Sequence, residues 1–340
     1  MGRGFNFQGM RTNTYYNEHC MKTMARMADG MVNTVVTSPP YYLLRDYGHP
    51  DQIGLEGSME EYIATMVDVF REVRRVLADD GTLWLNLGDS YSMSLKGKGD
   101  KHRPDRKWNK GNEKSGSLRQ VRDLPAKNLL GIPWRVALAL QADGWILRQD
   151  IIWHKPNPMP ESVTDRCTKA HEYIFLFSKS PKYYYDHKAI MVDAQPESWK
   201  GSAFDKGKTA TANNNGRTSG NATRKTAEHR GVYEGVNANV CGSVPWEGTK
   251  ANRRSVWSVS SQPFKEAHFA TFPEDLIAPC ILAGCPEGGL VYDPFGGAFT
   301  TAVVAARAMR KWVVSEINPE YCKMGQKRLK EQGLTNMLFQ

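Results

Sequence analysis

Two short segments of this 340-residue chain carry side chains whose types and spacing suit ligand binding. The first is Thr37-Ser38-Pro39-Pro40-Tyr41, which directly follows the apolar run Val35-Val36. Ser38 supplies a hydroxyl acceptor and the Pro39 carbonyl a second acceptor, and the consecutive prolines hold both in place because neither rotates freely about φ. Tyr41 adds an aromatic face. The segment predicts a rigid site for a flat group that donates hydrogen bonds.

The second segment, Asp293-Pro294-Phe295-Gly296-Gly297, lies between an apolar strand and a helix. Its glycines let the backbone approach a ligand closely, its aspartate meets a cationic group, and Phe295 presents a π face to a cation. Glu316 ends the next predicted strand about 20 residues further on, where a carboxylate accepts hydrogen bonds from ribose hydroxyls. The pattern is neither the Gly-x-Gly-x-x-Gly dinucleotide fingerprint nor a phosphate loop.

Both segments follow strands, so the fold must bring the ends of those strands together. Apolar runs predict strands at residues 32–36, 82–87, 145–153, 173–177, 290–292 and 312–316. Helical periodicity and end signals predict helices at residues 60–77, 133–141, 273–283, 300–309 and 319–330, the first closed by Asp79-Asp80-Gly81. Such alternation implies an α/β fold with a mainly parallel sheet and helices on both faces. In open parallel sheets, ligands bind where the strands end.

Together the two segments resemble the catalytic and cofactor motifs of DNA methyltransferases that modify exocyclic amino groups. Their order, with the catalytic motif first, is that of the permuted group called beta. The resemblance implies a Rossmann-like, S-adenosylmethionine-dependent methyltransferase acting on a base flipped out of double-stranded DNA. A base amine is a poor nucleophile because its lone pair is delocalised into the ring. In this family the Ser38 hydroxyl and the Pro39 carbonyl would accept its hydrogen bonds and favour sp3 character at the nitrogen. Pro39 and Pro40 would fix these acceptors, and Tyr41 would stack on the base.

The same resemblance implies S-adenosyl-L-methionine as the cofactor. Residues 268–274 resemble an additional cofactor-binding segment of the family, and Ala298 or Phe299 stands where the family has a third glycine. The implied cofactor-binding residues are Asp293, Phe295, Gly296, Gly297, Thr300, Glu316, Asn318, Thr271, Phe272 and Ser38. Near the N-terminus, Glu18 is a weak match to an acidic residue that touches the adenine amine. Segments 88–91 and 153–158 follow other strands, and they either line the base pocket or are plain strand ends.

The net charge of +9 is concentrated in two segments that lack regular apolar periodicity. Residues 95–123 hold ten basic residues against four acidic ones, and residues 182–265 hold thirteen against seven. Such surfaces suit DNA phosphates. We expect DNA contacts from Lys96, Lys98, Lys101, Arg103, Arg106, Lys107, Arg217, Arg224, Lys225, Arg253 and Arg254.

These observations predict three parts. Residues 1–180 form the catalytic part, with 95–123 as a basic loop, residues 181–265 form a target-recognition region, and residues 266–340 form the cofactor-binding part. The hydrophobic content of 40% and charged content of 24% are those of a soluble globular protein. No apolar run suits a membrane span. Six scattered cysteines without a Cys-x-x-Cys pair predict reduced thiols and no metal site, as in a cytoplasmic protein. We expect a protein of bacterial or phage type that is associated with the nucleoid through DNA.

The target base stays open between two alternatives. Family members that methylate adenine N6 mostly carry Asp where this chain has Ser38, so the sequence favours cytosine N4. An RNA or protein methyltransferase and a catalytically inactive DNA-binding protein are further alternatives. A restriction-modification setting is expected, although nothing in the chain reveals an accompanying endonuclease or a recognition sequence. Relatives of the permuted group are often dimers, which makes a homodimer one option.

Overall fold

The structure, a computed structural model, describes residues 10–44, 46–92, 124–193, 250–261 and 272–334. The chain divides into two compact units, Met1–Ile190 with Arg254–Gln340, and Met191–Arg253. In the second unit, β6 (Val192–Asp193) pairs antiparallel with β7 (Lys250–Ala251). The basic loop at 95–123 and most of the expected target-recognition region lie outside the described residues.

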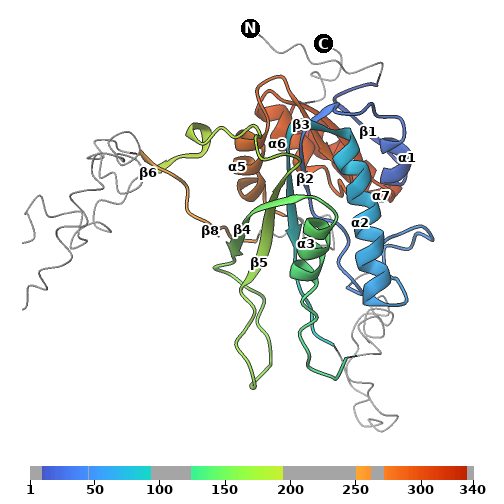
Figure 1. Ribbon diagram of the computed structural model, residues 1–340, viewed down its shortest axis with the longest axis vertical. Helices are drawn as coiled ribbons and strands as arrows, with labels where there is room; N and C mark the ends of the chain where they lie inside the picture. Colours follow the sequence, from blue (N-terminus) through green and yellow to red (C-terminus); the bar gives the residue numbers. More distant parts are fainter. Residues whose placement is uncertain (1–9, 45, 93–123, 194–249, 262–271, 335–340) are drawn as a thin grey trace, which may run out of the picture. The chain divides into compact units, whose positions relative to one another are not determined.

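The first unit is built on one eight-stranded sheet (Figure 1). In spatial order its strands are β1 (Thr14–Tyr16), β10 (Lys311–Ser315), β9 (Leu290–Asp293), β2 (Val32–Thr37), β3 (Leu77–Leu87), β5 (His171–Ser178), β4 (Ile146–His154) and β8 (Val256–Ser258). Neighbouring strands run parallel except that β5 is antiparallel to both β3 and β4. The expectation of a mainly parallel sheet is confirmed. The short strands β1 and β8 were not predicted individually.

Helices cover both faces of the sheet, as the sequence predicts. They are α1 (Cys20–Met24), α2 (Met59–Val76), α3 (Ile132–Ala142), α5 (Glu274–Gly284), α6 (Thr300–Arg307) and α7 (Pro319–Glu331), with a 3-10 turn at Lys188–Ile190. No helix in the described part of the chain has the length and hydropathy that a membrane span requires.

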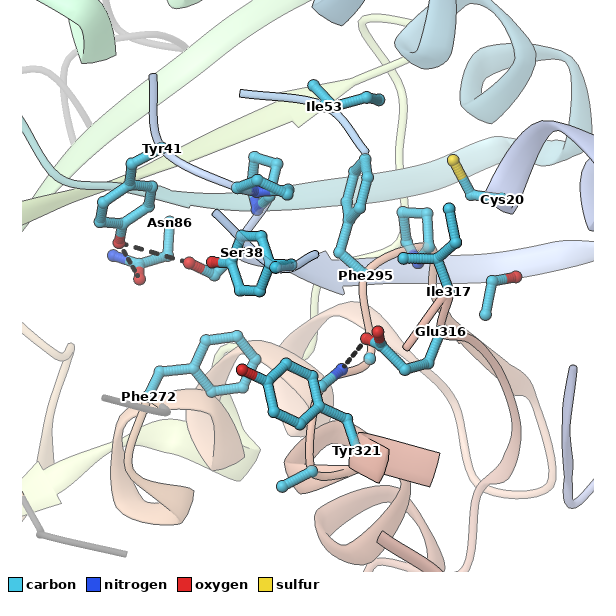
Figure 2. A pocket seen from close by; sticks show the side chains of 18 of the residues that line it. Cys20, Ser38, Tyr41, Ile53, Asn86, Phe272, Phe295, Glu316, Ile317 and Tyr321 are labelled. Atoms are coloured by element: carbon cyan, nitrogen blue, oxygen red, sulfur yellow. Dashed lines mark hydrogen bonds between the residues drawn. The ribbon is translucent and has the colours of Figure 1, made fainter. Parts of the chain in front are cut away.

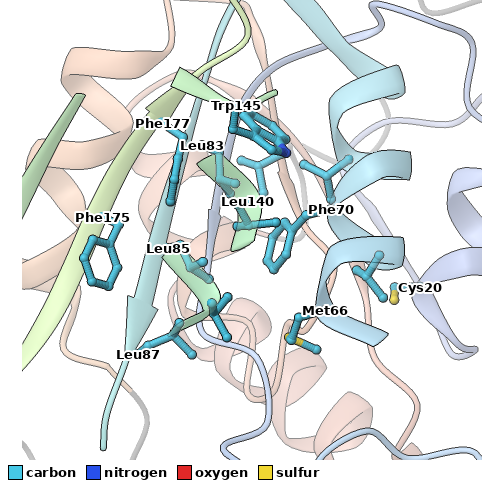
Figure 3. Packing of buried hydrophobic residues seen from close by; sticks show 14 of the residues in the cluster. Cys20, Met66, Phe70, Leu83, Leu85, Leu87, Leu140, Trp145, Phe175 and Phe177 are labelled. Atoms are coloured by element: carbon cyan, nitrogen blue, oxygen red, sulfur yellow. The ribbon is translucent and has the colours of Figure 1, made fainter. Parts of the chain in front are cut away.

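Alternating residues of the central strands supply two separate cores. Leu83 and Leu85 of β3 pack with α1, α2 and α3, and Figure 3 shows them beside Phe70 of α2 and Leu140 of α3. Trp84, between them in sequence, packs with α5 and α6 on the other face. Successive side chains of a strand point to opposite faces, so one strand holds both helical layers.

The junction between α2 and β3 differs from the expected one. Ser58 caps the start of α2 by accepting from the Glu61 amide. The helix ends at Val76, and β3 begins at once with Leu77, which has extended backbone angles and is fully buried. The sequence predicted that Asp79-Asp80-Gly81 would close the helix and that the strand would begin at Thr82. Burial of Leu77 and its pairing with Val32 start the strand before these polar residues.

The connections run in opposite directions from the middle of the sheet. The chain passes from β2 through α2 to β3 on one side, and from β9 through α6 to β10 on the other. Strands β2 and β9 are parallel neighbours, with Val35 opposite Tyr292. Their carboxyl ends therefore flank the point where the winding reverses, which is where ligands bind in open α/β sheets.

Gly325 offers a test of the packing behind this point. An alanine inside a helix normally stabilises it by about 1 kcal/mol relative to glycine. A Cβ at Gly325, however, would lie 2.2 Å from ring atoms of Phe299, a fully buried residue with φ of 61° at the start of α6. We expect Gly325→Ala to lower the free energy of unfolding by about 1–3 kcal/mol, measured by urea denaturation. Lys327→Ala, at an exposed position of the same helix, should change it by less than about 0.5 kcal/mol. A stabilised Gly325→Ala protein would contradict the packing described.

Candidate active site

A cavity of about 260 Å³ lies at the carboxyl edge of the sheet and is lined by both sequence motifs. Figure 2 shows Ser38 and Tyr41 at one end, Glu316 at the other, and Phe295 between them. Pro40 and Gly296 line this same cavity. Of the implied catalytic and cofactor-binding residues, those that line it are Ser38, Pro39, Pro40, Tyr41, Phe272, Phe295, Gly296, Gly297, Thr300 and Glu316.

Two hydrogen bonds fix the Ser-Pro-Pro-Tyr loop and the residues that follow it. The Tyr62 hydroxyl of α2 donates to the Pro40 carbonyl at 2.9 Å. The Leu43 amide donates to the Gly54 carbonyl at 2.8 Å. Tyr62 is fully buried in the core, so its bond to Pro40 fixes the loop relative to the helix.

Ser38 and side chains from two further strands, β3 and β5, surround the Tyr41 hydroxyl. It lies 2.8 Å from Glu172 Oε2, 3.2 Å from Asn86 Oδ1 and 3.3 Å from Ser38 Oγ. Glu172 also forms an ion pair with Lys155, and both side chains are largely buried. All five residues line the cavity, which gives this end of it a dense set of polar groups.

The glycine turn passes very close to β10. A Cβ at Gly296 would lie 1.9 Å from Val314 Cγ1, so no other residue fits there without displacing the Val314 side chain. Gly297 has a φ of +49°, in the left-handed region that glycine adopts without strain. The Gly296 amide donates to the Ser315 carbonyl at 2.9 Å. These contacts bring the backbone of the turn to the cavity wall.

Asp293 is fully buried and does not line the cavity. Its Oδ1 accepts from the Thr37 hydroxyl at 2.6 Å and from the Phe295 amide at 3.0 Å, and its Oδ2 accepts from the Thr301 hydroxyl at 2.7 Å. Burial raises the pKa of Asp293 to about 6, although these hydrogen bonds oppose the shift. The carboxylate was expected to meet a ligand directly, but it is buried away from the cavity and its hydrogen bonds support the loop.

Glu316 does face the cavity, at its other end. Its Oε2 accepts from the Gly297 amide and its Oε1 from the Asn318 amide, each at 2.7 Å. Only 8% of the residue is exposed, and burial raises the pKa of Glu316 to about 7. A carboxylate has further lone pairs beyond the two used here, so Glu316 retains capacity to accept from hydroxyl donors.

The remaining expected residues take other positions or cannot be placed. Asn318 caps α7 by accepting from the Glu320 amide and does not line the cavity. Arg254 is exposed, and its carbonyl accepts from Trp257 Nε1. Arg253 is half-buried at the end of the second unit. The residues outside the described ranges are Thr271, Lys96, Lys98, Lys101, Arg103, Arg106, Lys107, Arg217, Arg224 and Lys225.

Several residues in or near the cavity were only partly foreseen. Trp153 and Lys155 line the cavity, whereas Asp89 caps α3 by accepting from the Gly131 and Ile132 amides. Glu18 lines the cavity, and the Arg26 hydrogen bond lowers its pKa. Asn86 and Glu172 were not predicted. Asn86 lies at the end of β3, a position that could have drawn attention, but Glu172 begins a strand and carries no comparable signal.

The model of a DNA methylase family, N6/N4 methylases, matches residues 32–327. That range includes both motifs and every strand from β2 to β10. The chain belongs to the N6/N4 DNA methylase family. The methylase is thus an enzyme that acts on amino groups of DNA, as the sequence motifs led us to expect.

Similar proteins agree with this assignment. The methylase is 39% identical over 325 residues to the type II methyltransferase M.Cfr9I of Citrobacter freundii, covering 96% of this chain and 90% of that protein. It is 42% identical over 295 residues to the type II methyltransferase M.SmaI of Serratia marcescens, covering 87% and 83%.

Solved structures confirm the Rossmann-like methyltransferase fold of the methylase. PvuII DNA methyltransferase (cytosine-N4-specific) matches with a TM-score of 0.61 at 18% identity, over 98% of this chain and 95% of that one. A putative DNA modification methylase from Thermus thermophilus, complexed with S-adenosyl-L-methionine, matches with a TM-score of 0.52 at 19% identity, over 93% and 94%.

The buried Glu316 carboxyl of the methylase should make its stability depend on pH. A carboxyl whose pKa rises from 4.5 to about 7 on folding resists ionisation in the folded state. Its contribution is therefore complete below about pH 4.5 and is lost as pH rises through about 7, a loss on the order of 3 kcal/mol. Urea denaturation without ligand should show the free energy of unfolding falling over this range. In Glu316→Gln the part of the fall above about pH 6 should disappear, and identical pH slopes in the two proteins would contradict the assignment.

Proposed function

We propose that this methylase transfers the methyl group of S-adenosyl-L-methionine to N4 of a cytosine flipped out of double-stranded DNA. The observation that carries the proposal is the cavity in which the Ser38 hydroxyl and the Glu316 carboxylate face one space, with Phe295 between them. An acceptor for a base amine and an acceptor for ribose hydroxyls thus border a single volume.

The Glu316 end of the cavity suits S-adenosyl-L-methionine. Its carboxylate would accept from the ribose hydroxyls, the Phe295 ring would lie against the cationic sulfonium, and the backbone at Gly296 and Gly297 leaves room for close approach. When bound, this cofactor supplies an electrophilic methyl group. Asp293 would keep the turn in shape through Thr37, Thr301 and the Phe295 amide without touching the ligand.

The Ser38 end would hold the amine. Ser38 Oγ and the Pro39 carbonyl would accept hydrogen bonds from the two N–H groups, drawing the nitrogen away from conjugation with its ring. Tyr41 lines the same wall and offers a surface for the base. The loop is fixed from below by Tyr62, so these acceptors need little reorganisation when the base enters.

Ser38 supports cytosine over adenine as the target base. The family resemblance associates a serine at this position with N4-cytosine enzymes and an aspartate with most N6-adenine enzymes. Adenine N6 is therefore the alternative, and the Ser-Pro-Pro-Tyr motif together with the motif order supports membership of the permuted beta group.

The remaining parts of the proposal concern DNA. Residues 181–265 would recognise the target sequence, while basic residues there and in the loop at 95–123 would contact phosphates. Residues 1–180 and 266–340 would hold the catalytic and cofactor parts. The bacterial type II relatives support a restriction-modification role in the cytoplasm and nucleoid, and a homodimer is proposed from family resemblance alone.

Nucleoside mass spectrometry of treated DNA tests the proposal directly. The full chain is incubated with S-adenosyl-L-methionine and methylation-free duplex DNA, which is then digested to nucleosides. We expect N4-methyl-2′-deoxycytidine. N6-methyl-2′-deoxyadenosine would establish the adenine alternative. Methyl groups found only in added RNA or protein, or DNA binding without methylation, would overturn the proposed function.

Ser38→Ala should separate chemistry from binding. It removes the hydroxyl acceptor but leaves both prolines and the bond from Tyr62 in place. We expect the single-turnover methylation rate to fall by at least about 100-fold, while the dissociation constant for duplex DNA changes by less than about twofold. Fluorescence anisotropy measures the DNA affinity. An equal loss of DNA affinity would argue against Ser38 as an acceptor for the amine.

A further inference from the structure

Four side chains form one line of polar contacts along the cavity wall. Ser38 Oγ lies 3.3 Å from the Tyr41 hydroxyl, which lies 2.8 Å from Glu172 Oε2. The other oxygen of Glu172 forms an ion pair with Lys155. The ammonium of Lys155 also lies 4.2 Å from the centroid of the Trp153 ring, which holds it in place. Neither motif of the sequence includes Glu172 or Lys155.

Two features bring these side chains together: the direction of β5 and the lack of a side chain at Gly88. Because β5 is antiparallel to its neighbours, its first residues, including Glu172, reach the edge where β3 and β4 end. A Cβ at Gly88 would lie 2.6 Å from Tyr41 Cε2 and 3.2 Å from Glu172 Cδ. The absence of a side chain at Gly88 therefore allows Tyr41 and Glu172 to meet.

The hydrogen bonds in this line have a defined direction. An ionised carboxylate only accepts hydrogen bonds, and the ammonium of Lys155, which only donates, lies on the other oxygen of Glu172. Burial, followed by the charge of Glu172, raises the pKa of Tyr41 well above its ordinary value, so the phenol keeps its proton. That proton points to Glu172 or to the nearby Asn86 Oδ1, in both cases away from Ser38. The oxygen of Tyr41 is then the acceptor for the Ser38 hydroxyl.

We propose that Glu172 is a positioning residue that keeps Ser38 a hydrogen-bond acceptor toward the target amine. With its own proton committed to Tyr41, Ser38 presents only lone pairs to the cavity. The amines of cytosine and adenine both donate, so a serine turned the other way would meet the amine donor to donor. This inference rests on the proposed function, because it concerns the orientation of the same catalytic hydroxyl.

Glu172→Gln tests the proposal without changing the shape of the side chain. The amide of the glutamine can donate to Tyr41, which frees the phenol proton to turn toward Ser38 and the serine proton to turn into the cavity. We expect the single-turnover methylation rate to fall about 10- to 100-fold. The dissociation constants for S-adenosyl-L-methionine and duplex DNA should stay within about twofold of wild type. Glu72→Gln, the same change at an ion-paired glutamate on α2, serves as the matched control and should leave the rate unchanged.

A double-mutant cycle with Tyr41→Phe shows whether the effect runs through Tyr41. Tyr41→Phe keeps the ring but cuts the line between Ser38 and Glu172, so it should itself slow methylation. In that background Glu172→Gln should cause no further loss of rate. Multiplied losses would overturn the proposal, since Glu172 would then act by another route such as structural support. A Glu172→Gln rate equal to wild type would overturn it as well.

The outcomes also separate this proposal from the one it rests on. If the wild-type chain methylates DNA and Glu172→Gln does so at the same rate, only the positioning role fails. If the wild-type chain leaves DNA unmodified, the proposed function itself fails. Thermal denaturation shows whether each variant is folded. If Glu172→Gln is unstable, the methylation rate of Tyr41→Phe, which removes only one oxygen, supplies a second measurement.

Discussion

Thr37 and Asp293 are 256 residues apart in the sequence, and a hydrogen bond of 2.6 Å joins their side chains. It lies where two parallel neighbours, β2 and β9, reach the same edge of the sheet. The Ser-Pro-Pro-Tyr loop begins one residue after Thr37, and the glycine turn begins one residue after Asp293. The geometry of the cavity depends on this junction, because each wall is anchored to one of its two partners.

The junction is buried, and burial explains much of the electrostatics around it. Asp293 and Glu316 are both carboxyls removed from water, which raises the pKa of each. Each accepts from an amide of the glycine turn, and Asp293 also accepts from the hydroxyls of Thr37 in β2 and Thr301 in α6. Such a pair costs stability at neutral pH, yet it ties the turn to the ends of two strands at once.

Local patterns in the sequence reveal the framework well. Apolar periodicity predicted a strand at 32–36 and a helix at 60–77, which are observed at Val32–Thr37 and Met59–Val76, and the two motifs follow β2 and β9 as expected. Glu172 did not emerge, because its place at the edge depends on β5 running against its neighbours. A strand's direction within a sheet is decided by tertiary pairing and leaves no local trace. The supporting position of Asp293 was missed for a similar reason, since its partner Thr301 comes from the following helix.

The pairing of β1 with β10 has a separate consequence for protein engineering. Thr14 lies opposite Val313, so the earliest and latest strands of the described chain are neighbours. The pairing of strands in the sheet depends on which strands lie side by side, and it does not depend on the order in which the chain connects them. A synthetic gene could join these two regions by a linker and start at a surface connection between the two motifs. The encoded protein would have the same sheet edge, but the glycine turn would come before the Ser-Pro-Pro-Tyr loop in its sequence.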